Sequence, residues 1–215
     1  MQAVPKERPI LFSAPMVRAL LDGSKTQTRR VVKPRDVAWM GEHQGLREPD
    51  NAIRCPYGQA GDRLWVRETW SIDMLGAFGT DKGYDSTYAL RYRADDAERE
   101  IHVAPGEPDP YITLYDSQRG DWRPSIHMPR WASRILLEIV SVRVERLQDI
   151  SEADARVEGV TIEDRHKNGY CASEFLPPSI RAYRDLWESI NGAGSWDSNP
   201  WVWVVEFTHV PMERR

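Results

Sequence analysis

The sequence predicts an α+β fold, a small β-barrel decorated by short helices. Five or six segments carry the apolar pattern of strands, and three carry the period of helices. These segments follow one another in mixed order, without the strand–helix–strand rhythm that builds a doubly wound parallel sheet. The 215 residues, of which 40% are hydrophobic and 29% charged, provide the core of one domain with insertions.

The first sixty residues are predicted to give a strand, a helix and a second extended segment. The strand is Ile10–Phe12, and the helix over Pro15–Gly23 has proline in its first turn and glycine at its end. The next segment, Ser24–Lys33, is rich in β-branched residues, which favour extended backbone. Residues 35–60 show no clear period and are expected to be loop.

The middle of the chain combines one strand pattern with a long polar stretch. Arg63–Trp70 alternates between an apolar and a mixed face, which is typical of a strand. Residues 71–125 are polar and interrupted by Gly and Pro. Within them the pattern predicts one strand at Tyr88–Arg93 and a second extended piece at Tyr111–Tyr115.

The last third of the chain has the strongest patterns. Trp131–Arg146 is the longest strand-like stretch. Ser151 resembles the start of a capping box and predicts a short helix that ends at Gly159. Pro178–Ile190 carries an apolar stripe at helical spacing, and the unbroken apolar run Trp201–Val210 predicts a central strand.

Charge and composition restrict the class of protein. The 29 Lys+Arg and 33 Asp+Glu give a net charge of −4, which argues against a surface coated with nucleic-acid-binding charge but permits a local basic groove. Two cysteines are too few for a disulfide framework. Without an apolar leader or a membrane-length apolar run, the expected location is the cytoplasm, and no membrane partner is expected.

Most familiar catalytic motifs are absent from the sequence. The five His and two Cys show no zinc-type spacing, and there is no P-loop, no dinucleotide-binding glycine pattern and no GxSxG or HExxH motif. P-loop nucleotide hydrolysis and a zinc site are therefore excluded, and no metal or cofactor is predicted. A metal site made of carboxylates alone stays open.

The densest polar cluster is Lys25–Arg30, which has three cations and two hydroxyls in six residues. Such a cluster could bind an anion or polarise a carbonyl group. It could equally be a solvated edge strand whose charge prevents aggregation. A period of two places Thr26, Thr28 and Arg30 on one face, which Lys25 reaches only from the preceding turn.

Two further groups of residues are candidates for a functional site. Trp65, Arg67 and Glu68 lie in the predicted strand of the middle region, where an Arg–Glu pair near a Trp is either structural or lines a pocket. Glu158, beside Gly159, ends a short helix, where a carboxylate opposes the helix dipole. An acid in that position is disfavoured unless another group uses it.

These clusters together resemble the ASCH-domain family, a branch of the PUA-like superfamily of small β-barrels. The segments that carry the resemblance are Pro9–Ser13, Gly23–Arg30, Gly61–Glu68, Ile150–Gly159 and Trp201–Phe207. The chain is most similar to the longer ASCH proteins of phages and prophages. The resemblance implies a single PUA-like domain over residues 1–215, with short flanking helices and insertions at about 35–60 and 71–125.

The resemblance also implies an activity and a set of site residues. Compact bacterial ASCH proteins include metal-independent amidohydrolases that remove the acyl group from N4-acetylcytidine. By position, their catalytic Lys, Thr and Glu correspond to Lys25, Thr28 and Glu158. The substrate-binding residues expected from the two polar blocks are Thr26, Arg29, Arg30, Trp65, Arg67 and Glu68.

Two alternative functions are also compatible with the sequence. The ASCH family also includes members linked to ribonuclease activity, and other PUA-like domains bind RNA. The partner would then be single-stranded RNA instead of a modified nucleoside. The long insertions favour a third reading, a non-catalytic, phage-associated interaction protein. The salt dependence of binding distinguishes the amidohydrolase from the RNA-binding protein, because polyanion binding weakens steeply with salt.

Overall fold

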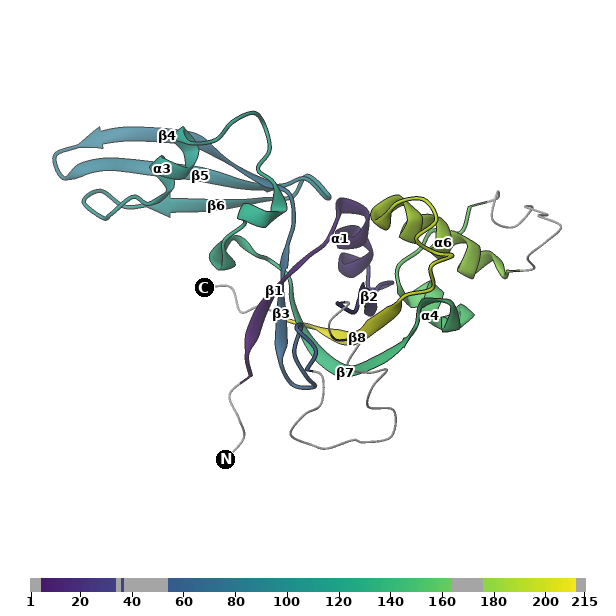
Figure 1. Cartoon of the computed structure of the whole chain (residues 1–215). Helices are drawn as coiled ribbons and strands as arrows, with labels where there is room; N and C mark the ends of the chain where they lie inside the picture. Colours follow the sequence, from purple (N-terminus) through teal and green to yellow (C-terminus); the bar gives the residue numbers. More distant parts are fainter. Residues whose placement is uncertain (1–4, 34–35, 37–53, 164–175, 212–215) are drawn as a thin grey trace. The chain divides into compact units, whose positions relative to one another are not determined.

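The structure is a computed structural model that describes residues 5–33, 36, 54–163 and 176–211 (Figure 1). The strands are β1 (Glu7–Leu11), β2 (Gln27–Val31), β3 (Arg63–Arg67), β4 (Trp70–Thr80), β5 (Gly83–Tyr92), β6 (Glu98–Val103), β7 (Leu136–Arg146) and β8 (Trp201–Val210). The α-helices are α1 (Ala14–Leu21), α3 (Tyr111–Asp116), α4 (Glu152–Val157) and α6 (Pro178–Asn191). Short 3₁₀ turns lie at Ser125–His127, Arg130–Ala132 and Leu147–Asp149.

The strands form two sheets. One has the order β1-β3-β7-β8-β2, and the other has the order β4-β5-β6. This confirms the α+β class. Among the described residues neither sheet closes into a barrel.

The chain folds into two compact units. The first comprises Met1–Arg8, Ala19–Leu64 and Leu137–Val210. The second comprises Pro9–Arg18, Trp65–Leu136 and Pro211–Arg215. Within the described residues, no helix is long and apolar enough to cross a membrane.

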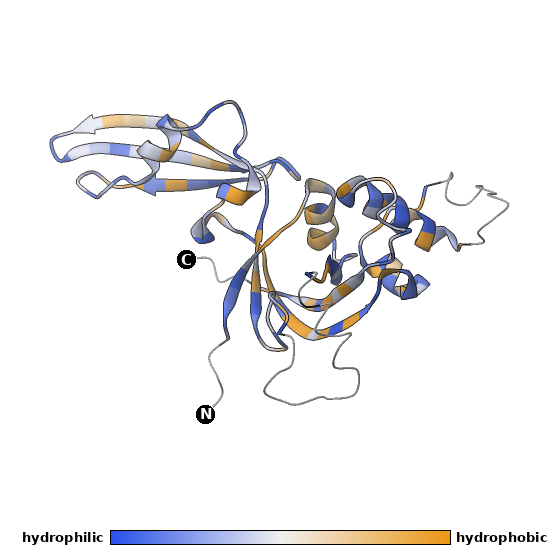
Figure 2. Cartoon of the chain, in the orientation of Figure 1, coloured by the Kyte–Doolittle hydropathy of each residue, from blue (hydrophilic) through white to orange (hydrophobic). Residues whose placement is uncertain are grey.

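In the first unit, an apolar cluster joins the sheet to two helices. Val202 and Val204 of β8 pack with Ala155 of α4 and with Tyr183 and Trp187 of α6. Figure 2 shows the apolar residues of β7 and β8 in orange. The predicted central position of β8 is confirmed, because this strand lies between β7 and β2.

The helix α4 begins where the sequence predicts. Ser151 is its N-cap, and its hydroxyl accepts a hydrogen bond from the backbone N–H of Asp154 at 3.0 Å. This bond satisfies one of the N–H groups that the first turn of a helix leaves without a partner. The cap fixes the start of the helix that later supplies Asp154 and Glu158.

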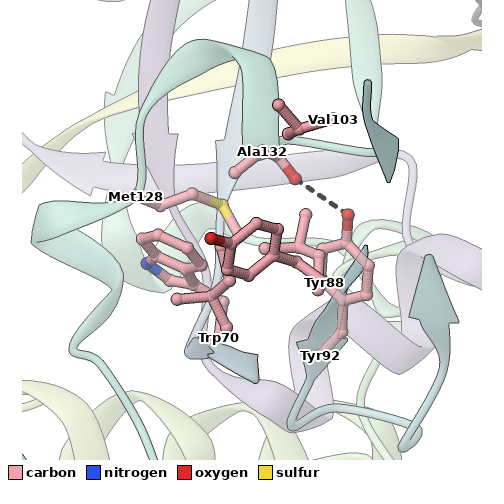
Figure 3. Packing of buried hydrophobic residues seen from close by; sticks show 8 residues of the cluster. Trp70, Tyr88, Tyr92, Val103, Met128 and Ala132 are labelled. Atoms are coloured by element: carbon pink, nitrogen blue, oxygen red, sulfur yellow. Dashed lines mark hydrogen bonds between the residues drawn. The ribbon is translucent and has the colours of Figure 1, made fainter. Parts of the chain in front are cut away.

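The second unit contains more regular structure than the sequence suggests. Residues 71–125 were expected to hold one strand, yet they hold most of β4 and all of β5 and β6. Figure 3 shows a buried cluster of this unit, in which the Tyr92 hydroxyl donates to the carbonyl oxygen of Ala132 at 2.9 Å. Trp70, Tyr88 and Met128 are fully buried in the same cluster.

An irregularity in β4 changes which face its residues occupy. Met74 pairs with Tyr88, but Gly76 pairs with Thr87, so Leu75 is an extra residue in β4. A bulge of this kind interrupts the alternation of side chains. Phe78 therefore pairs with Asp85, on the face opposite Met74 and Tyr88.

The prediction of an extended piece at Tyr111–Tyr115 is wrong, because this segment is the helix α3. Asp109 explains the difference, since its carboxylate accepts hydrogen bonds from the backbone N–H groups of Tyr111 at 3.0 Å and Ile112 at 3.2 Å. An aspartate that bonds to backbone two or three residues ahead favours a helical turn over a strand. The β-prone composition of the segment hid this signal.

The remaining element predictions agree with the structure in type. The first predicted strand and helix are β1 and α1, and the segment after them contains β2. In the strand pattern of the last third, β7 begins only at Leu136, because Trp131 lies in a 3₁₀ turn. Most of the loop predicted at residues 35–60 lies outside the described residues.

Candidate functional site

Lys25 and Glu158 form a buried ion pair in the first unit. The Lys25 Nζ atom donates to Glu158 Oε2 at 2.8 Å and to the Glu158 carbonyl oxygen at 2.8 Å. The two residues also form an isolated antiparallel β-bridge. The exposed fractions of their side chains are 0% and 3%, so both charges are held away from water.

Local backbone structure brings the two residues together. The Lys25 N–H donates to the carbonyl oxygen of Ala19 in α1, and Glu158 is the C-cap residue of α4. Gly159 follows with a φ of +78°, and a Cβ atom on it would lie 2.7 Å from Ala19 Cβ and 3.0 Å from Lys25 Cβ. A glycine is therefore required where the chain passes the stem of Lys25.

Arg29 extends the pair into a network of carboxylates. Its NH1 group donates to Glu158 Oε1 at 3.0 Å, and its Nε and NH2 groups donate to Glu145 Oε1 at 2.9 and 2.6 Å. Its NH2 group also lies 3.3 Å from Asp154 Oδ2. The guanidinium has no exposed surface, and it lies 5.9 Å from the centre of the Tyr183 ring.

The network continues across β7 and β8. Arg143 pairs with Glu145 at 3.1 Å, with Asp154 at 3.4 Å and with Glu206. Ser141 donates to Glu206 Oε2 at 2.7 Å. Three cations and four carboxylates, from β2, β7, β8, α4 and their flanking residues, thus form one connected group.

Burial and neighbouring charges shift the ionisation of this group. Burial lowers the pKa of the Lys25 ammonium, and Arg30 and Arg29 act in the same direction, while Glu158 only partly opposes them. Burial also opposes the charge on Arg29, but the Glu158 and Glu145 carboxylates nevertheless raise the pKa of its guanidinium. Lys25 therefore loses its proton more readily than an ordinary lysine.

Gln27 lies on the same face of β2 as Arg29. Its side-chain Nε2 donates to the carbonyl oxygen of Asp154 at 2.9 Å and to Asp154 Oδ1 at 3.0 Å. Asp154 thus holds both residues, and their strand partners are Glu206 and Val204. Lys25, which precedes β2 by two residues, reaches the same network.

The other predicted residues of this block alternate along the chain with those of the network. Thr28 is 2% exposed, but it alternates with Gln27 and Arg29 and therefore occupies the opposite face of β2. Arg30, two residues further, shares that face and is half-buried. Thr26 precedes the strand and is exposed.

Trp65, Arg67 and Glu68 belong to the second unit. The Arg67 guanidinium lies 4.6 Å from the centre of the Trp65 ring, but Arg67 does not pair with Glu68. Instead Arg134 binds both carboxylate oxygens of Glu68, at 2.8 and 2.9 Å, and also pairs with Asp95. The geometry of Glu68 is thus that of a buried structural ion pair.

Sequence reasoning missed several members of the network, namely Gln27, Arg143, Glu145, Asp154 and Glu206. Two signals point to three of them. Arg143 and Glu145 alternate with valines along one strand, which places both on one face. Lys25, Gln27 and Arg29 are also spaced by two, so the alternation that groups Thr26, Thr28 and Arg30 equally groups these three.

Metal binding has no support in the described part of the chain, where no group of three or more His, Cys, Asp and Glu side chains could hold an ion. The carboxylates of the network are instead occupied by Lys25, Arg29 and Arg143. Compared with protein-family models, with curated proteins and with solved structures, the chain matches none.

Proposed function

We propose that the chain is an amidohydrolase that removes the acyl group from N4-acylated cytidine, with Lys25 and Glu158 as its proton-transfer pair. The observation that carries the proposal is a lysine amine with a lowered pKa, held 2.8 Å from a buried carboxylate. A lower pKa raises the fraction of the amine that is neutral at a given pH, and the neutral amine is the form that accepts a proton. The resemblance of the Lys25–Arg30 block to the ASCH amidohydrolases supports the choice of substrate.

The proposed reaction assigns a step to each residue. Lys25 takes a proton from a water molecule, whose oxygen attacks the acyl carbonyl carbon. The resulting ammonium stabilises the oxyanion of the tetrahedral intermediate. The bond between the carbonyl carbon and N4 then breaks, and Glu158 relays the proton from Lys25 to N4. The products are cytidine and the carboxylic acid.

Water is the nucleophile in this scheme, not Thr28. The alternation of β2 directs the Thr28 side chain away from the face that carries Arg29 and the carboxylates. Arg29 acts by positioning, because Glu145 and Glu158 occupy all three of its nitrogens. The proposal requires the site to open for substrate, since Lys25 has no exposed side-chain surface.

The burial of the block argues against RNA as the partner of these cations. A phosphate backbone is bound by exposed Lys and Arg. Two of the three cations of the block, Lys25 and Arg29, are buried and already paired with carboxylates. Lys25 and Arg29 therefore contribute little positive electrostatic potential that could attract a polyanion.

The test is a chromatographic assay of cytidine release from N4-acetylcytidine by the wild type and by Lys25→Met with Glu158→Gln. The double variant removes both charges, so it leaves no unpaired buried ion to unfold the protein. Lys82→Met is the matched control, because Lys82 is exposed in the turn between β4 and β5. We expect release by the wild type and the control, and at least about a thousandfold loss in the double variant.

Two results would contradict the proposal. Wild-type protein that releases no cytidine would exclude this substrate. Equal release by the folded double variant would exclude Lys25 and Glu158 from the reaction. Thermal unfolding of each variant establishes that the compared proteins are folded.

A further inference from the structure

Gln27 has a buried side-chain amide of which only one end is bonded. The residue is 1% exposed, and its Nε2 group donates to the Asp154 carbonyl oxygen and carboxylate. Among the residues that the structure describes, its Oε1 atom has no hydrogen-bond partner and is shielded from water. A buried carbonyl oxygen without a partner is costly and is rare in folded proteins.

The orientation of this amide is fixed. Asp154 accepts both hydrogens of the Gln27 amide, and the same Asp154 carboxylate lies 3.3 Å from the Arg29 guanidinium. Because the NH₂ end is held on Asp154, the Oε1 atom must point away from it. Rotation of the amide would place two oxygens of Asp154 against Oε1, so the free acceptor is held in place.

We propose that Gln27 determines substrate specificity by accepting a hydrogen bond from the N–H of the scissile amide. This inference rests on the function proposed above. Gln27 shares a strand face with Arg29, whose NH1 group donates to Glu158 Oε1. A neutral acceptor recognises an N–H donor and repels a carbonyl oxygen, so it would select secondary amides, which carry one hydrogen on N4.

The experiment compares two substrates in each protein. N4-acetylcytidine has the N–H, whereas N4-acetyl-N4-methylcytidine carries a methyl group in its place. The variants are Gln27→Met, which lacks donor and acceptor, and Gln27→Lys, which retains a donor for Asp154 but lacks the acceptor. Gln148→Met is the matched control, since Gln148 is exposed and donates to Trp196 outside the network.

The measured quantity is the ratio of kcat/KM for the two substrates. We expect both Gln27 variants to lower this ratio at least about tenfold from the wild-type value, mainly by slowing hydrolysis of N4-acetylcytidine. Gln148→Met should retain the wild-type ratio. Because each ratio is taken within one protein sample, a partly unfolded fraction cancels.

The outcomes distinguish this inference from the proposed function. If the wild type hydrolyses neither substrate, both are overturned. If the wild type hydrolyses N4-acetylcytidine and both Gln27 variants keep its ratio, the amidohydrolase activity stands and the role of Gln27 is overturned.

Discussion

Lys25 illustrates how a single residue can be both costly and useful. Removing an ammonium group from water costs several kcal/mol, and only a well-placed counter-ion offsets that cost. Here Glu158 supplies two acceptors, one from its carboxylate and one from its backbone. These acceptors do not fully offset the cost of burial, so the pKa of Lys25 is lowered. A lysine that acts as a base needs such a lowered pKa.

The ionisation of Lys25 predicts a pH dependence of stability. The pKa of Lys25 in the folded state lies below its ordinary value of 10.5, so between these two values the unfolded chain binds the extra proton. The free energy of unfolding that Lys25 contributes should therefore rise with pH through this window and level off above about 10.5.

Urea denaturation of the wild type and Lys25→Met at a series of pH values measures this contribution as a difference. The subtraction is needed because burial raises the pKa of Tyr88 and Tyr92 to about 12, which makes stability fall with pH above 10. If this difference in the free energy of unfolding stays flat or falls as pH rises, the folded state does not lower the pKa of Lys25.

At the scale of elements, α4 delivers two carboxylates to one network. Asp154 and Glu158 are four residues apart and thus lie about one turn apart on one side of the helix. Their placement depends on where the helix begins, which the Ser151 hydroxyl determines. A local capping signal therefore controls a site assembled from distant parts of the chain.

Ser151→Ala should lower the free energy of unfolding by about 1 kcal/mol, the usual cost of losing an N-cap hydroxyl. It should also lower kcat/KM for N4-acetylcytidine a few-fold, because Asp154 and Glu158 shift with the helix start. Ser189→Ala is the control, since Ser189 is exposed near the end of α6 and outside the network. Equal losses of stability in the two variants, measured by urea denaturation, would contradict the role of the cap.

The comparison of α3 with α4 shows what the sequence can reveal about an element. Ser151 precedes a helix-forming segment, so its cap was readable. Asp109 stabilises the start of α3 in a similar way, but the Tyr111–Tyr115 segment is β-prone and its helix is short. The helix was predicted correctly at α4, where the capping residue and the helix propensity of the segment agree. It was missed at α3, where the capping residue and the β propensity of the segment conflict.

At the scale of the whole molecule, much of the positive charge of the polar block is neutralised internally. The net charge of −4 adds no attraction for polyanions. The polar block and the resemblance indicated Lys25, Arg29 and Glu158. The other two carboxylates at Arg29 belong to Glu145 and Asp154, which come from β7 and α4. Pairing between such distant segments depends on sheet order, which no local pattern in the chain specifies.

Hydrolysis of N4-acetylcytidine should therefore be almost independent of salt. We expect kcat/KM to change less than about twofold between about 50 and 500 mM NaCl, because the substrate is neutral and the network is shielded from solvent. Steady-state assays at matched pH measure this, with binding of a labelled single-stranded RNA as the comparison. A steep loss of activity with salt would point to a charged substrate.

The extra residue in β4 has a consequence for how this hairpin can change in evolution. Leu75 is 55% exposed and stands outside the pairing that joins Met74 to Tyr88 and Gly76 to Thr87. Loss of its codon would leave each of those pairs intact and would restore the unbroken alternation of side chains along β4. Related sequences that differ in length within this hairpin should therefore carry their gap at this position.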